Sequence, residues 1–528
     1  MLERKGAGDA DVGDLAVVTR GRGRARVQRV LGPACAIESA LEALLEERGA
    51  RAPFEPYERP RDPAGEGRVD LRGLTTFTID PETAKDFDDA VSIEEDGDGL
   101  RAWVHIADVA AFVPPGSPLD RGAARRAFST YVPGLVAPML PPELADDACS
   151  LRPHVDRFCL TVEVGSDATP SFYRSIIRSD ARLTYGEAEA ILAGRETAAV
   201  GEALQRAERL TTELRRRRFA RGALRIETGE TVFRFDGRGG IADARREEEP
   251  HAHMLVEELM ILANEAVARL LAERRREALF RVHERPDPHS IELLAAKLAD
   301  LAVPTPPLPE EGRLSPGDAA RAAGRISELV NGYVAQTGRG REAFPSLVLR
   351  ALKQARYDAR SLGHSGLASR AYCHFTSPIR RYPDLVCHRA LLRELGSGDG
   401  LAAEEELVVL AEHCSLRERE AAEIEYAADA LCLAWLLESR LFESGWDAGF
   451  GGEIIGLVGS GLFARFDEVF EGFLPARRLP DDYFELNPLG TALVGRRGGA
   501  TFRLGDPIEV RVVDIRRGEG KVELELAT

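Results

Sequence analysis

Four aspartates fall close together in the segment Thr-Ile-Asp-Pro-Glu-Thr-Ala-Lys-Asp-Phe-Asp-Asp-Ala at residues 78–90: Asp80, Asp86, Asp88 and Asp89. Carboxylates this close repel one another, so a fold that gathers them needs a positive charge among them. Hard divalent cations such as Mg²⁺ prefer oxygen ligands and commonly supply that charge. The segment therefore predicts a metal-binding loop, of the kind that supports phosphodiester chemistry by two metal ions.

The flanks of this segment have the pattern of strands. Residues 75–79 are rich in β-branched side chains, and Pro81 ends the run because proline cannot donate to a strand ladder. Residues 90–93 and 100–106 predict a hairpin across the Asp-Gly-Asp-Gly turn at residues 96–99. We therefore expect the aspartates in a loop between strands, where a rigid scaffold fixes their positions.

The aspartate spacing alone leaves another interpretation open, which is an acidic loop that faces solvent. An EF-hand calcium loop fits poorly. With Asp86 as its first ligand, the sixth position is Val91 instead of glycine and the twelfth is Gly97 instead of glutamate.

Further motifs identify a family. The chain has Trp-Val-His-Ile-Ala-Asp-Val at residues 103–109, Ser-Thr-Tyr-Val-Pro at 129–133, Pro-Met-Leu-Pro at 138–141, Glu-Glu-Leu-Met-Ile-Leu-Ala-Asn at 257–264, and Tyr-Cys-His-Phe-Thr-Ser-Pro-Ile-Arg-Arg-Tyr-Pro-Asp at 372–384. Together with the aspartate segment, and in this order, they resemble the catalytic region of the ribonuclease II/ribonuclease R family, the RNB domain.

The resemblance implies a catalytic centre. The four aspartates would hold two Mg²⁺ ions, with Mn²⁺ as an alternative, and loss of Asp88 should abolish cleavage most cleanly. Arg380 corresponds to the essential arginine of the last motif, and its fork suits bidentate contact with a phosphate. Pairing of Arg380 with a buried carboxylate is the other interpretation. Glu258 is implied to belong to the site and to help hold the 3′-terminal nucleotide.

The resemblance also implies residues that bind RNA. Tyr131 matches a tyrosine that stacks on terminal bases, and a stacked base contributes about 1–3 kcal/mol. Glu423 matches an acid that orients the terminal ribose, with a surface helix acid as the other interpretation, and Arg381 is expected to contact phosphates. Where the family has a stacking phenylalanine, this chain has Ile226, which offers no π-face. We therefore expect a weaker hold on the last nucleotides and a longer limit product.

The chain divides into three parts. Residues 1–70 predict two strands, at 12–18 and 25–31, and a helix at 38–48. They resemble only the tail of the cold-shock region that usually precedes the catalytic domain, so the N-terminal region is expected to be truncated, unless the start codon is misplaced. Residues 71–445 form the predicted RNB domain, with helices at 185–192, 202–219, 252–276, 315–330, 346–361, 384–395 and 401–442. A sheet with many flanking helices is an α+β fold.

Residues 446–528 predict a small five-stranded barrel that resembles an S1-type RNA-binding domain, a relative of the OB-fold. Phe463 and Phe473 fall where the family presents stacking aromatics. Burial of both rings in the barrel core is the equally weighted alternative.

Composition limits the function classes. The net charge of −17 is unusual for a nucleic-acid binder, so RNA affinity would depend on the local field inside a channel. The chain has no run of eighteen apolar residues, and its first residues lack the apolar stretch of a signal peptide. Its seven cysteines have no metal or disulfide pattern. We expect a cytoplasmic monomer with no membrane contact.

The sequence thus predicts a Mg²⁺-dependent, hydrolytic 3′→5′ exoribonuclease that degrades single-stranded RNA to nucleoside 5′-monophosphates. Two alternatives stay open: a catalytically inactive RNA-binding protein that keeps the fold, and an endonuclease or DNase that uses the same metals. The sequence does not show whether a helicase or a degradation complex is a partner.

Overall fold

The computed structural model describes residues 10–21, 24–58, 65, 67–225, 229–237, 239–247, 250–310, 312–397, 404–480 and 482–527. It confirms an α+β fold with a mixed sheet, flanking helices, a closed C-terminal barrel and N-terminal strands. None of the helices in these ranges is both long enough and apolar enough to cross a bilayer.

A seven-stranded sheet is the centre of the catalytic region. In sheet order its strands are β11 (Ala181–Thr184), β4 (Phe77–Asp80), β5 (Asp89–Asp96), β6 (Gly99–Ala107), β9 (Asp156–Val164), β10 (Pro170–Arg178) and β3 (Val69–Asp70). The two edge pairs are parallel and the others antiparallel. The predicted hairpin is β5–β6, and Gly97 takes a φ of 62° in its tight turn, where glycine is favoured.

Helices cover both faces of this sheet. One face packs against α3 (Tyr185–Leu192), α4 (Gly201–Ala220) and α5 (His251–Glu273), with Phe77 and Leu255 in the shared core. A capping box between Thr184 and Glu187 begins α3. The other face packs against α2 (Pro118–Arg126), the short helix Glu143–Ala148 and α9 (Tyr382–Glu394).

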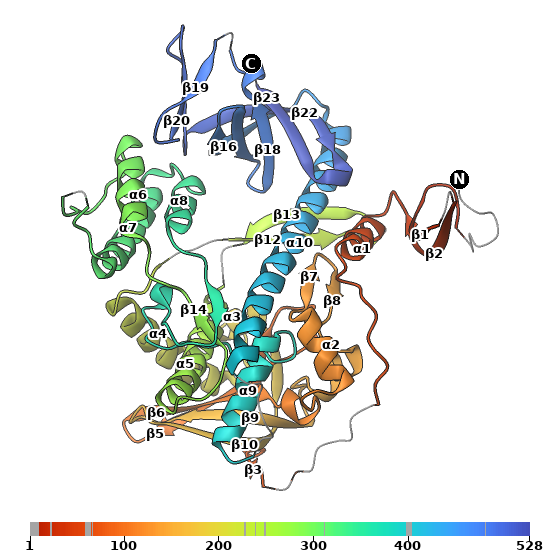
Figure 1. Cartoon of the computed structure of the whole chain (residues 1–528), viewed down its shortest axis with the longest axis vertical. Helices are drawn as coiled ribbons and strands as arrows, with labels where there is room; N and C mark the ends of the chain where they lie inside the picture. The colour runs from red at the N-terminus through yellow and green to blue at the C-terminus, as the bar shows by residue number, and fades with distance from the viewer. Residues whose placement is uncertain are drawn as a thin grey trace.

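Smaller elements surround these layers. Three helices with a separate apolar core lie beside the barrel (Figure 1): α6 (Pro288–Asp300), α7 (Pro316–Thr337) and α8 (Ala343–Ala351). The two-stranded sheets are β1 (Asp14–Gly21) with β2 (Arg24–Pro33), β7 (Thr130–Val132) with β8 (Leu135–Ala137), β12 (Glu230–Phe235) with β13 (Ile241–Glu247), and β14 (Phe280–Val282) with β15 (Arg356–Asp358). The remaining N-terminal helix is α1 (Ile37–Glu47).

One long helix joins the catalytic region to the barrel. Helix α10 (Glu404–Ser444) has 41 residues, which makes it about 60 Å long at 1.5 Å per residue. It runs from beside the sheet to the barrel (Figure 1). The barrel consists of β16 (Gly449–Val458), β17 (Gly461–Phe466), β18 (Phe470–Pro475), β23 (Lys521–Leu526) and β22 (Pro507–Arg516), and so has the five strands that were predicted.

Among the differences from the sequence prediction, two concern strand pairing. The helix expected at 346–361 ends at Ala351, and the chain then enters β15 (Arg356–Asp358), because this segment pairs with β14. A three-stranded sheet that the sequence did not reveal is inserted in the barrel, formed by β19 (Phe484–Leu486), β20 (Ala492–Gly495) and β21 (Thr501–Arg503).

Candidate active site

The predicted aspartate loop connects two paired strands of the sheet. Asp80 is the last residue of β4 and Asp89 the first of β5, and these strands pair through Phe77 and Val91. Burial is the main cause that raises the pKa of both carboxyls; the charge of Asp86 further raises the pKa of Asp80, and the charge of Asp80 that of Asp89. The pairing of β4 with β5 therefore gathers negative charge at one end of the sheet.

Asp88 connects this loop to the distant motif at residues 376–381. Its carboxylate is 3% exposed, with one oxygen accepting from the backbone N–H of Ile379 at 2.8 Å. The other oxygen accepts from Nε of Arg380 at 3.3 Å, and Nη2 of Arg380 donates to Oγ of Ser377 at 3.0 Å. The Arg380 side chain is still 43% exposed. Arg380 thus pairs with a buried carboxylate and also faces solvent, and its contact with a phosphate stays a prediction.

Tyr131 links the aspartate loop to helix α10. Its hydroxyl donates to Oδ2 of Asp86, and its backbone N–H donates to Oε1 of Glu425 at 2.9 Å. Burial, and next the charge of Asp86, raise the pKa of the tyrosine well above its usual value, so the phenol stays protonated. Tyr131 therefore lies beside the aspartate loop, and its stacking on terminal bases stays a prediction.

The acid on α10 that reaches this site is Glu425 and not Glu423. Glu423 is exposed, whereas Glu425 is partly buried against Tyr131. Burial raises the pKa of Glu425, while its bond to Tyr131 and the charge of Arg380 lower it. The contacts favour Glu425 as the acid of this site, because two residues turn a helix by about 200°, while the ribose contact of Glu423 stays a prediction.

Replacement of Glu425 by alanine should lower RNA shortening about tenfold, since hydrogen bonds to a charged group are worth about 1.5–3 kcal/mol. The matched variant Glu423→Ala should leave the rate unchanged, because its side chain faces solvent. Initial rates on a labelled oligoribonucleotide check both. An effect of Glu423→Ala equal to that of Glu425→Ala would contradict the corrected assignment.

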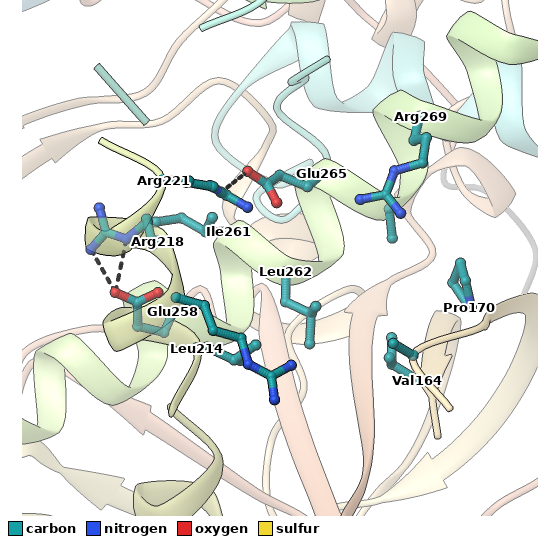
Figure 2. A pocket seen from close by; sticks show the side chains of 13 residues that line it. Val164, Pro170, Leu214, Arg218, Arg221, Glu258, Ile261, Leu262, Glu265 and Arg269 are labelled. Carbon is teal, nitrogen blue, oxygen red and sulfur yellow. Dashed lines mark hydrogen bonds and ion pairs between the residues drawn. The ribbon is translucent and has the colours of Figure 1, made fainter. Parts of the chain in front are cut away.

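Glu258 faces away from the aspartates. Its carboxylate is 2% exposed and accepts from Nε and Nη2 of Arg218 on α4, at 3.0 and 2.5 Å. Figure 2 shows this pair at a pocket of about 200 Å³, with a second pair between Glu265 and Arg221. Burial raises the pKa of Glu258 and Arg218 opposes the rise. The structure thus gives Glu258 a role in α4–α5 packing, which corrects its predicted place in the active site.

The neighbouring Glu257 is more exposed than Glu258 and also reaches Nη2 of Arg218, at 3.5 Å. One turn before it, the ring of His253 lies 5.4 Å from that of Tyr185. Burial raises the pKa of Tyr185, and the charges of Asp89 and Asp80 add to this effect. The second glutamate of the Glu-Glu motif was chosen from sequence, whereas helical spacing of four places the first with His253.

Arg381 is a structural residue in this fold. Its side chain is 19% exposed, and Nη2 donates to Oδ1 of Asp384 at 2.7 Å. Asp384 is fully buried and also accepts from the backbone N–H of Ser377 at 2.8 Å. The predicted phosphate contact of Arg381 is therefore corrected to support of the loop that holds Arg380. Ile226, the predicted substitute for a stacking residue, lies outside the described residues.

Phe463 and Phe473 lie on the outer wall of the barrel. They face each other across β17 and β18, with ring centroids 5.0 Å apart, and Phe463 is 42% exposed. The barrel interior takes the alternating residues, among them Leu462, Phe466 and Leu474. The alternative that both rings form the core is wrong, while their contact with RNA stays a prediction.

The aspartates supply the oxygen ligands that a divalent cation prefers, but their side chains are not arranged around one point. Within the described ranges no group of three His, Cys, Asp or Glu side chains is arranged as a metal site. Oδ2 of Asp80 is nevertheless buried and, among these residues, meets no donor at hydrogen-bond distance. A cation there would stabilise the Asp80 and Asp89 carboxylates, whose burial favours the neutral form. The metal ligands stay a prediction.

Comparison with known proteins connects this geometry to a family. The RNB domain model matches residues 68–397. Ribonuclease R of Escherichia coli (strain K12) is 38% identical over 483 residues, which cover 87% of this chain but only 57% of that protein.

Solved structures agree on the fold. Ribonuclease R of Mycoplasma genitalium, in complex with ribose methylated single-stranded RNA, has a TM-score of 0.87 and 26% identity, covering 100% of this chain and 85% of that chain. Yeast Ssd1, a pseudonuclease, has a TM-score of 0.68 and 17% identity, covering 91% of this chain and 61% of its own, which shows a shared fold alone. Because the family model covers more than half of the sequence, the chain belongs to the RNB domain family of ribonuclease II and ribonuclease R.

Proposed function

We propose that this protein is a Mg²⁺-dependent, hydrolytic exoribonuclease that removes nucleoside 5′-monophosphates from the 3′ end of single-stranded RNA. The observation that carries the proposal is the junction between Asp88 and Arg380, because it places a half-exposed guanidinium directly beside the buried aspartate loop. A cation and an arginine fork around one phosphate are the parts that phosphoryl chemistry needs.

Arg380 is placed to bind a phosphate, and Tyr131 is held in position beside the same site. Nε of Arg380 donates to Asp88, and Nη2 donates to Ser377. In the described part of the chain neither Asp88 nor Ser377 bonds Nη1 of Arg380, so Nη1 can donate to a phosphate oxygen. The fixed bonds of Tyr131 to Asp86 and Glu425 hold its ring beside the same site. When bound, Mg²⁺ would supply charge neutralisation and an acidified water.

The substrate rests on the relatives, and the 3′→5′ direction on the resemblance of the sequence motifs. The Escherichia coli protein is a ribonuclease R, and the Mycoplasma genitalium protein was solved with single-stranded RNA. Discrimination against DNA would depend on contacts to the 2′-hydroxyl, and readout should be nearly independent of sequence because phosphates and stacked faces carry little sequence information.

A second candidate function is RNA binding without cleavage. It is favoured by the shared fold with Ssd1, which is a pseudonuclease. The complete set of Asp80, Asp86, Asp88 and Asp89 together with Arg380 argues against it, since a binding protein gains nothing from buried carboxylates whose charged form is costly.

Metal removal separates the two candidates. Purified protein with a 5′-labelled oligo(A) should shorten it stepwise in Mg²⁺, and EDTA should abolish shortening until excess Mg²⁺ restores it. Binding without shortening in Mg²⁺ would favour the inactive protein. Fragments of intermediate length from the first time point, or equal cutting of a deoxy substrate, would indicate an endonuclease or a DNase.

A further inference from the structure

One large exposed side chain lies between the catalytic site and the barrel. Tyr426 is 68% exposed on α10, directly after Glu425, which binds the backbone of Tyr131. Its hydroxyl donates to Oε2 of Glu471 on β18 at 3.5 Å, the limit of a hydrogen bond. Helix α10 contacts β7 on the catalytic side and β18 on the barrel side (Figure 1). The bond to Glu471 on β18 places Tyr426 at this junction.

The barrel side of this junction carries the aromatic pair. Glu471 and Phe473 are two residues apart on β18, so they point from the same face, about 7 Å apart along the strand. Phe463 lies opposite Phe473 on β17. Tyr426 therefore contacts the strand that carries Phe473, while its neighbour Glu425 contacts Tyr131.

The charges around Tyr426 favour a base over a phosphate. Glu425 and Asp429 lie on neighbouring turns of α10, and after burial it is the charge of Glu425 that most raises the pKa of Asp429. Glu471 adds a third carboxylate, which Arg465 on β17 partly neutralises. A phosphate would be repelled from this surface, whereas an aromatic face accepts a base without positive charge.

We propose that Tyr426 is a stacking platform for one base of single-stranded RNA, between the pair Phe463/Phe473 and Tyr131. The proposal rests on the proposed RNA-degrading function. It names a base-stacking residue that the proposed cleavage chemistry does not itself require. The opposing view is that Tyr426 only joins the helix to the barrel through Glu471. That view predicts that loss of the hydroxyl weakens RNA binding and that loss of the aromatic ring adds nothing further.

The experiment measures RNA affinity without cleavage. Full-length protein in EDTA is titrated into fluorescent oligo(A), and anisotropy gives Kd for the wild type, Tyr426→Leu and Tyr426→Phe. Leucine keeps apolar bulk without a π-face, and should raise Kd about tenfold, whereas phenylalanine should stay near the wild type. The matched control is Phe442→Ala, which removes another exposed aromatic from the same helix and should leave Kd unchanged.

A scan with abasic nucleotides locates the contact. One abasic site is moved stepwise from the 3′ end of the oligomer, and a position stacked on Tyr426 should weaken wild-type binding but not binding of Tyr426→Leu. The same profile in both proteins, or an equal loss of affinity in Tyr426→Phe and Tyr426→Leu, would overturn the platform. A wild type that binds no RNA at all would instead overturn the proposed function.

Discussion

Replacement of Asp88 by asparagine should lower the rate of RNA shortening by about 10²–10³-fold while RNA binding persists, since that is the usual loss for one preorganised electrostatic group. The buried carboxylate accepts from Ile379 with one oxygen and from Arg380 with the other. Asparagine has the same shape but turns an N–H₂ donor toward one of these donors. Arg380 then loses its anchor, and a metal loses one charged ligand. Single-turnover rates on 5′-labelled oligo(A) in Mg²⁺ check this.

The matched control is Asp98→Asn. Asp98 is exposed in the β5–β6 turn, at the end of the hairpin opposite the aspartate loop. The Asp98→Asn variant should therefore shorten RNA at the rate of the wild type. A rate for Asp88→Asn within about threefold of the wild type would remove Asp88 from the chemistry. Equal loss of binding and cleavage would instead indicate that the loop around Arg380 had collapsed.

Local signals in the sequence were sufficient for much of the fold. The Asp-Gly-Asp-Gly turn fixed the β5–β6 hairpin, and the helix predicted at 185–192 coincides with α3, whose capping box is visible as Thr184 and Glu187. These features depend on residues a few positions apart. The β14–β15 pair depends on a distant partner, and the sequence did not reveal it. The β19–β21 insertion was also missed, although its strands follow one another in the sequence.

Site residues were predicted well where a rigid motif fixed them and poorly on helices. Asp88 and Arg380 meet although nearly three hundred positions separate them, because both belong to dense motifs. Glu423 and Glu258 each stand near another acid that points to a different side of the same helix, Glu425 and Glu257, since one residue turns the helix by about 100°. Helical spacing relative to Tyr131 and His253 was the missing information, and only the fold supplies it.

The buried pair of Arg381 and Asp384 leads to the second large effect. Asp384→Ala should destabilise the protein by about 3–5 kcal/mol, the usual cost of leaving a buried charge unpaired. The change leaves the Arg381 guanidinium without its carboxylate partner and also removes the acceptor of the Ser377 N–H. Thermal unfolding checks it, with Glu519→Ala as the control. Glu519 pairs with Arg516 at the same i,i+3 spacing but at the surface, where a pair contributes about 0–1 kcal/mol.

A double-mutant cycle tests whether the two residues act as one unit. Arg381→Met and Asp384→Leu should each lower the unfolding temperature, while the double variant should lose less than the sum of the two, because no unpaired charge then stays buried. If Arg381 bound a phosphate instead, Arg381→Met would keep its stability and lower the slope of log affinity against log salt by about one. We expect the opposite result, because Asp384 already holds the Arg381 guanidinium in the protein interior.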